Sequence, residues 1–148
     1  LGDVYKRQEY APSGMGQQGT LMVVTQNPEL VAKLSKMNAD VMGTESDPFY
    51  GAPTVVVVFA DSNMPTCVEN GSLVMGNLMN AAHALGVDSC WIHRAREVFA
   101  SEEGKALKAE WGVPESYVGI GHCVLGYRSG EYPKAKGWPM GGPVHRRL

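Results

Sequence analysis

Apolar residues recur along the chain with two periods, one typical of strands and one typical of helices. β-branched runs predict strands over residues 20–25, 53–60 and 118–127, the second of them buried on both faces. In the last strand, Gly119 and Gly121 permit a bulge or the close approach of another segment. Helices between and around these strands predict an α+β domain, with three layers built on a single sheet.

Three segments show the apolar spacing of helices. Asn27 caps the first, which has Pro28 at its first position and a stripe of apolar residues (Leu30, Val31, Leu34 and Met37). An irregular loop is predicted from residue 38 to residue 52, because Gly43, Pro48 and Gly51 fall there. The last helix is predicted over residues 101–111 and is stopped by the Gly112-Val113-Pro114 sequence.

The longest helical pattern begins at Thr66 and ends before Gly86. Thr66 and Glu69 have the spacing of a capping box, and the apolar positions are Leu73, Leu78, Met79, Ala82 and Leu85. Four small residues leave parts of this helix almost bare: Gly71, Gly76, Ala81 and Ala82. Such a surface suits either ordinary core packing or the close approach of a backbone or a flat ligand. Residues 87–93 are predicted to form a short apolar turn.

Composition narrows the class of protein. A length of 148 residues predicts one domain, and a net charge of −2 gives no general attraction for nucleic acid or acidic lipid. The longest apolar run, residues 55–60, is far too short to cross a bilayer. Cys67, Cys90 and Cys123 are odd in number and widely spaced, which favours reduced thiols in a cytoplasmic protein.

Both ends of the chain look atypical. The opening LGDVYKRQ corresponds to the translated end of a common transposase sequencing adapter, so residues 1–8 are expected to be an adapter scar. Residues 9–136 are then a partial domain. Residues 137–148 form a Gly/Pro-rich tail without a strand pattern, for which a frameshift is one explanation. The late basic residues Lys134, Lys136, Arg146 and Arg147 fit either a phosphate contact or a plain tail.

Little acid–base chemistry is visible in the sequence. His83, His93, His122 and the cysteines lack the spacing of a structural zinc site, so no metal is expected. A nucleophilic cysteine or serine with a histidine partner stays open, although Cys67 and Cys123 lie in apolar segments, where cysteine is usually a small buried hydrophobe. The residues alone therefore favour a protein that binds a cofactor or small molecule with its backbone.

Three segments together resemble the FMN-dependent nitroreductase family. EYAPSGMGQQ (residues 9–18) resembles its Ala-Pro-Ser-Gly-x-Asn-x-Gln signature, residues 77–92 resemble its central helix and flavin-side turn, and residues 118–127 resemble its late strand. The resemblance implies a three-layer α+β fold with a central, mostly antiparallel sheet and a long dimer helix. It also implies a cytoplasmic homodimer whose FMN sites lie in the interface, each lined by both subunits.

The resemblance also implies roles for particular residues. The expected FMN-binding residues are Pro12, Ser13, Gly14, Gly16, Gln17, Trp91, Ile92, His93 and Arg94. The first four would meet FMN supplied mainly by the partner subunit, and the last three would lie beside the flavin ring, with a backbone N–H near its N5. The implied reaction is ping-pong hydride transfer from NAD(P)H to nitroaromatics, quinones or similar acceptors. The flavin performs it, and no catalytic side chain is named.

Two alternatives and two departures accompany this interpretation. The chain could be a flavin-binding module without turnover, or a relative that uses reduced FMN for dehalogenation or flavin breakdown; residues 38–52 show no obvious substrate lid for the latter. The family's Arg-x-Ser-x-Arg-like phosphate segment would fall where residues 1–8 now stand, and Gly16 replaces the usual Asn. The chain is therefore expected to bind FMN poorly or not at all, although the intact gene product would bind it.

Overall fold

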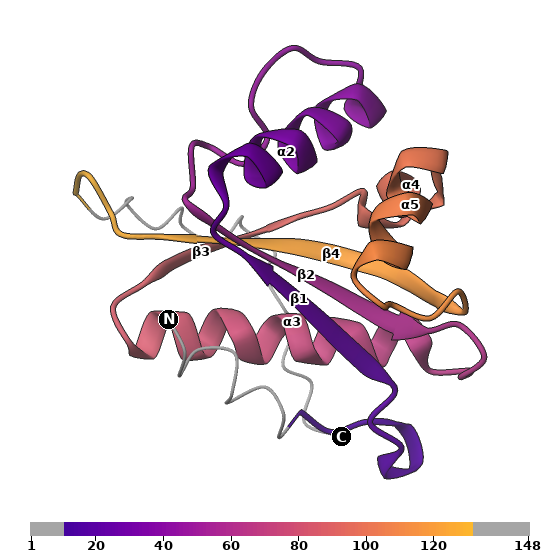
Figure 1. Cartoon of the computed structure of the whole chain (residues 1–148). Helices are drawn as coiled ribbons and strands as arrows, with labels where there is room; N and C mark the ends of the chain where they lie inside the picture. The colour runs from indigo at the N-terminus through magenta and orange to yellow at the C-terminus, as the bar shows by residue number, and fades with distance from the viewer. Residues whose placement is uncertain (1–10, 132–148) are drawn as a thin grey trace, which may run out of the picture.

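A computed structural model describes residues 11–131, which form a four-stranded antiparallel sheet covered by helices on both faces (Figure 1). The strand order is β1-β2-β4-β3. The elements in chain order are η2 (Gly14–Gly16), β1 (Thr20–Thr25), α2 (Pro28–Met42), β2 (Thr54–Asp61), α3 (Cys67–Ala84), β3 (Asp88–Ile92), α4 (Ala95–Ala100), α5 (Glu102–Glu110) and β4 (Tyr117–Gly126). The predicted segments 1–8 and 137–148 and the late basic residues lie outside the described residues.

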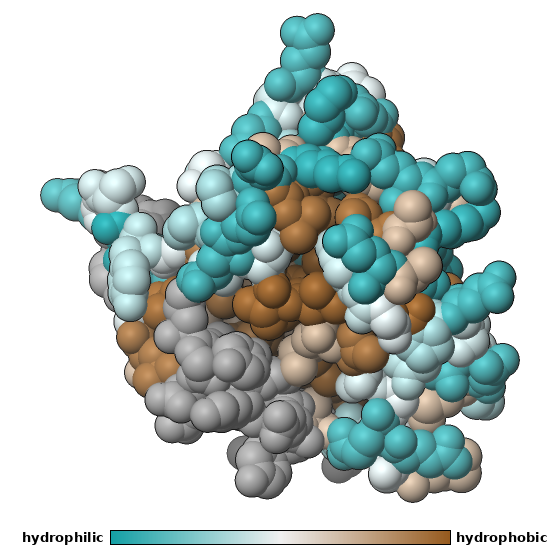
Figure 2. All heavy atoms as spheres, in the orientation of Figure 1, coloured by the Kyte–Doolittle hydropathy of each residue, from teal (hydrophilic) through white to brown (hydrophobic). Residues whose placement is uncertain are grey.

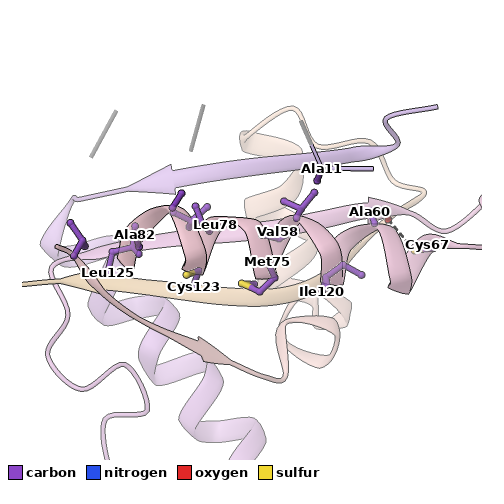
Figure 3. Close-up of a cluster of buried hydrophobic side chains, with 14 residues drawn as sticks. Ala11, Val58, Ala60, Cys67, Met75, Leu78, Ala82, Ile120, Cys123 and Leu125 are labelled. Atoms are coloured by element: carbon purple, nitrogen blue, oxygen red, sulfur yellow. Dashed lines mark hydrogen bonds between the residues drawn. The ribbon is translucent and has the colours of Figure 1, made fainter. Parts of the chain in front are cut away.

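The two faces of the sheet bury separate clusters, which confirms the predicted three layers. On one face, α3 packs over β2 and β4, and Met75 and Leu78 lie against Val58 and Cys123 (Figure 3). On the other face, α2, α4 and α5 cover Val55, Val57 and Phe59 of β2 together with Val124 of β4. Because β2 is covered on both sides, its run of valines is fully buried, as its continuous apolar pattern predicts.

β4 contains the bulge that its glycines permit. Val58 of β2 pairs with Gly121 and the next residue, Phe59, pairs with Gly119, so Ile120 is the extra residue. Ile120 therefore joins Cys123 in the cluster under α3, whereas Gly119 faces α4. Figure 2 shows apolar surface in the middle of the face on which α2 and the edge strand β1 lie.

The small residues of α3 serve different purposes. A Cβ on Gly71 would collide with Cγ1 of Ile120, so this glycine lets the helix approach β4. A Cβ on Gly76 would meet nothing within 4 Å, and the exposed side chains of Val68 and Leu73 lie on the same helix. Leu73 and Leu85, which the spacing grouped with Leu78, are exposed, while Leu78 is buried. Core packing thus accounts for Gly71, whereas among the described residues nothing lies where a side chain at position 76 would begin.

Alanine at these two glycines is expected to change stability in opposite directions. Gly71→Ala should lower the free energy of unfolding by about 2 kcal/mol, because the new methyl group overpacks the contact with Ile120. Gly76→Ala should raise it by up to about 1 kcal/mol, because alanine favours the helix and nothing opposes the methyl group. Urea unfolding of both variants checks this; equal signs for the two changes would contradict the packing described here.

Four local predictions are corrected by the structure. The capping box does not form, because the Thr66 side chain makes no capping hydrogen bond and instead lies against Gly14. Residues predicted as a turn form β3, which pairs with β4 and needs no strong apolar pattern because it is an edge strand. α2 continues to Met42 before Gly43 ends it, so the loop is shorter than predicted. The short helix α4 was not predicted at all.

Other local predictions are confirmed. Oδ1 of Asn27 accepts hydrogen bonds from the backbone N–H groups of Glu29 and Leu30, which caps α2 as predicted. Gly86 and Gly112 adopt left-handed φ angles of 71° and 67° after α3 and α5. Within the described residues, no helix has both the length and the apolar character needed to span a bilayer.

Candidate functional site

The loop that precedes β1 rests on the first turns of α3. The backbone N–H of Gly14 donates a hydrogen bond to Oδ1 of Asn70, at 2.9 Å, and Asn70 is only 2% exposed. A Cβ on Gly14 would collide with Oγ1 of Thr66. The hydroxyl oxygen of Ser13 accepts from the backbone N–H of Gln18, also at 2.9 Å. Gly14 is thus required for a close contact with α3, and Ser13 closes the loop.

The outer side of this loop presents backbone rather than long buried side chains. Met15, Gly16 and Gln18 adopt left-handed φ angles of 52°, 67° and 51°. A Cβ on Gly16 would meet nothing within 4 Å, and Pro12 and Gln17 are exposed. Left-handed conformations at non-glycine residues are costly and persist where surrounding contacts enforce them. The loop is therefore a fixed structure with an accessible outer surface.

The second group of predicted residues lies where β3 ends. Trp91 pairs with Cys123 and places its indole beside Gly121, on the α3 face of the sheet, with 37% of its surface exposed. A side chain at position 121 would occupy the place of the indole, so Gly121 gives Trp91 its position. Ile92 points to the opposite face and is buried, and His93 is exposed.

Arg94 contributes its backbone to this region and directs its side chain away. Its φ angle is 72°, a left-handed turn between β3 and α4. Its Nε donates to Oδ1 of Asn38 at 3.1 Å, and its Nη2 lies 3.3 Å from the sulfur of Met42. The guanidinium group is therefore held against α2.

Both groups of residues lie along the same part of α3. Asn70 supports Gly14, and Met75 lies beside Gly121 and the indole of Trp91. These two helix residues are five positions apart, which corresponds to about 7.5 Å along the helix axis. No hydrogen bond among the described residues joins the loop to residues 91–94. Each group thus contacts α3 within its first half.

The buried histidine and cysteines do not form a nucleophilic site. His122 and Cys123 face opposite sides of β4, as their adjacency predicts. Burial lowers the pKa of His122 to about 4 and raises the pKa of Cys123 to about 12. Burial also raises the pKa of Cys67. A thiol that resists ionisation is a poor nucleophile. Within residues 11–131, no three His, Cys, Asp or Glu side chains are grouped to hold a metal ion.

Two cavities lie away from the predicted FMN-binding residues. One of about 850 Å³ lies between α2 and the loop that precedes β2, with Ser35 and Asp47 in its wall. The other, of about 540 Å³, lies between α4, α5 and the start of β4, with Arg96 and Tyr117 in its wall. Neither of these two cavities is lined by any of the predicted residues.

Sequence reasoning missed the two asparagines that support the site. Asn38 and Asn70 are 0% and 2% exposed, and each holds a backbone group of one predicted segment. Their signal in the sequence is a polar amide on the buried side of a helix, where a hydrophobic residue is usual. Such a residue is retained when its hydrogen bonds are made.

The chain has a three-layer α+β architecture, in which an antiparallel sheet lies between one long helix and a group of shorter ones. The nitroreductase family model matches residues 41–127, more than half of the chain. The protein therefore belongs to the nitroreductase family, which confirms the family and the fold predicted from the three segments.

Solved structures of this fold resemble the chain over nearly its whole length. A nitroreductase with bound FMN from Bacteroides fragilis NCTC 9343 is 24% identical with a TM-score of 0.87, and the match covers 99% of this chain and 86% of that chain. An FMN-dependent nitroreductase from Clostridium difficile R20291 is 22% identical over the same shares, with a TM-score of 0.85. Comparison with curated proteins gives no match.

The fold is shared with at least one different activity. Iodotyrosine deiodinase bound to FMN and 3-iodo-L-tyrosine is 20% identical with a TM-score of 0.66, and the match covers 90% of this chain and 82% of that chain. The likenesses establish the fold, while the reaction has to be argued from the residues of this chain.

Proposed function

We propose that the protein is an FMN-dependent NAD(P)H oxidoreductase that reduces nitroaromatics, quinones or similar acceptors. The observation that carries this proposal is that one chain presents both an accessible backbone loop (residues 12–17) and an accessible turn (residues 91–94), which two subunits would bring to the same flavin. Bound FMN would accept a hydride from NAD(P)H and pass electrons to the acceptor. The chain would bind and orient the reactants; its buried His122 and Cys123, with pKa values of about 4 and about 12, supply no proton exchange near neutral pH.

The residues present fit the ring of FMN better than its phosphate. Gly14 and Gly16 leave loop backbone accessible, and the half-exposed Trp91 gives a flat apolar surface. Backbone groups of His93 and Arg94 would orient the ring edge. Among the nine residues proposed for the site, the one guanidinium belongs to Arg94, and it is hydrogen-bonded to Asn38. We therefore assign the ring side of the site to these residues and no phosphate contact.

We also propose that the protein is a cytoplasmic homodimer formed across the outer face of α3. Val68 and Leu73 are 47% and 46% exposed there, which leaves apolar side chains for a second subunit to cover. FMN would then lie between the two subunits, with residues 12–17 of one and residues 91–94 of the other. The mass in solution measured by sedimentation tests the dimer.

Titration with FMN and with riboflavin tests the flavin site. Because the phosphate has no cationic partner among the proposed residues, we expect both flavins to bind weakly, with dissociation constants that agree within about threefold. Each charge-assisted hydrogen bond to the phosphate would contribute roughly 1.5–3 kcal/mol, or more than tenfold in affinity. Quenching of flavin fluorescence measures both constants. Binding of neither flavin would contradict the site, and FMN binding a hundredfold tighter than riboflavin would contradict the assignment to the ring side alone.

A second candidate function is reductive dehalogenation by reduced FMN. It is favoured by the structural likeness to iodotyrosine deiodinase, although the TM-score of 0.66 is lower than the 0.87 of the nitroreductase. The two candidates share the flavin site and differ in the acceptor. Supplying the reduced protein with either a quinone or a halogenated phenol separates them.

A further inference from the structure

Asn38 forms a buried polar cluster with three residues that are distant in the sequence. It lies in α2 with none of its surface exposed. Its Nδ2 donates to the backbone carbonyl of His93 at 2.7 Å and lies 3.4 Å from Nδ1 of His122. Its Oδ1 accepts from Nε of Arg94 at 3.1 Å. One side chain thus contacts both residues of the turn and the strand behind them.

This geometry uses the whole hydrogen-bonding capacity of the amide nitrogen. Nδ2 carries two hydrogens, one directed to His93 and the other available to His122. The His122 ring also interacts with backbone groups of Ile92 and His93, whereas its Nε2 makes no hydrogen bond with the described residues. A neutral imidazole is consistent with the ring contacts to Phe49 and Phe99, at centroid distances of 5.2 and 5.8 Å.

The turn held by Asn38 is otherwise costly. A left-handed φ of 72° is unfavourable at an arginine, because the Cβ then crowds the backbone. Before the turn, Ile92 pairs with His122, and after it, Ala95 packs directly on Gly119. Between Ile92 and Ala95 lie His93 and Arg94, and both are hydrogen-bonded to the Asn38 side chain. The helix α2 therefore sets the backbone conformation of a turn that lies 55 residues later.

We propose that Asn38, supported by His122, is a positioning residue that fixes the His93–Arg94 backbone in the orientation required at the flavin ring. The part of this inference that concerns the flavin ring rests on the proposed function. The positioning of the turn itself concerns only residues of this chain.

Amide hydrogen exchange of the flavin-free protein tests the positioning role. We expect Asn38→Ala to speed exchange at residues 93–98 relative to the amides of β2, because the turn and the first turn of α4 lose their anchor. The matched control is Asn27→Ala, which removes the cap of the same helix without touching the turn. It should leave the ratio of exchange at residues 93–98 to exchange in β2 unchanged. Equal ratios in both variants would overturn the proposal.

A second variant covers the case in which Asn38→Ala does not fold. Asn38→Asp keeps the volume and the acceptor for Arg94 but removes the donor to the His93 carbonyl, so faster exchange at residues 93–98 is expected here as well. Exchange at these residues like that of the unchanged protein would overturn the proposal.

Flavin binding tests whether the backbone held by Asn38 orients the flavin ring. In Asn38→Ala, the His93–Arg94 backbone loses the hydrogen bond that orients it. This loss should weaken riboflavin binding by roughly tenfold and change the visible circular dichroism of the bound flavin. Asn27→Ala should do neither. Absence of flavin binding in the unchanged protein would overturn the proposed function and the part that concerns the flavin ring together, whereas unchanged exchange would overturn the positioning role itself.

Discussion

Replacing Gly119 with alanine is expected to lower the free energy of unfolding by about 3 kcal/mol. A Cβ at this position would lie 2.5 Å from the backbone oxygen of Ala95 and 2.6 Å from its carbonyl carbon. These atoms belong to the first residue of α4, so the contact cannot be relieved by rotating a side chain. α4 would have to move away from β4, and the His93–Arg94 turn would move with it. Urea unfolding measures the loss.

The control for this substitution is another glycine to which alanine adds no contact. A Cβ on Gly130 would meet no described residue within 4 Å, so Gly130→Ala should change stability by less than about 0.5 kcal/mol. If Gly119→Ala were as stable as Gly130→Ala, the close packing of α4 on β4 would be contradicted. Flavin affinity should fall in Gly119→Ala as well, because His93 and Arg94, which are proposed to contact the flavin ring, directly precede α4.

The second large effect concerns pH. Burial lowers the pKa of His122 to about 4, below the value of about 6.5 expected in an unfolded chain. The unfolded state therefore binds a proton between these pH values that the folded state does not bind. The stability that His122 contributes is present above pH 6.5 and is lost as the pH falls toward 4. The total loss is on the order of 3 kcal/mol.

His122→Phe isolates this contribution, because a phenyl ring fills a similar space between Phe49 and Phe99 and cannot bind a proton. Acid also destabilises the protein through groups such as Asp47, so the expected result is a smaller slope of stability with pH and not its absence. Val124→Ala, on the same strand and face, should lower stability at every pH while keeping the slope. A slope in His122→Phe equal to that of the unchanged protein would contradict the neutral burial of His122.

The core strands and helices were predictable because the pattern of apolar and polar residues in each one depends on how that element is buried. The valine run of β2 could be buried only on both faces, and Asn27-Pro28 could begin only a helix. β3 was not predicted, because an edge strand with the exposed residues Cys90 and Trp91 has no clear apolar alternation. The capping box failed for a related reason. Thr66 is used for a contact with Gly14, 52 residues earlier, which no local pattern shows.

The sequence indicated which segments form the candidate site, but it did not indicate how their side chains are arranged. Family resemblance selected the loop at Ser13 and the turn at Arg94, whereas the direction of the Arg94 side chain depends on Asn38, 56 residues away. Contacts at such separations are set by how α2 lies on the sheet. Sequence periodicity shows that α2 has a buried face, and it cannot show which strand or turn that face meets.

Anaerobic reduction of the flavin-saturated protein by NADPH and NADH tests the central claim most directly. With at least one of the two nucleotides, the visible absorption band of the flavin should bleach faster than that of free FMN in the same solution, and a quinone or nitroaromatic added afterwards should restore it. Gly119→Ala, assayed below its unfolding transition, should show slower bleaching. A flavin that binds the protein yet stays oxidised with both nucleotides would contradict the oxidoreductase assignment and leave a flavin-binding module.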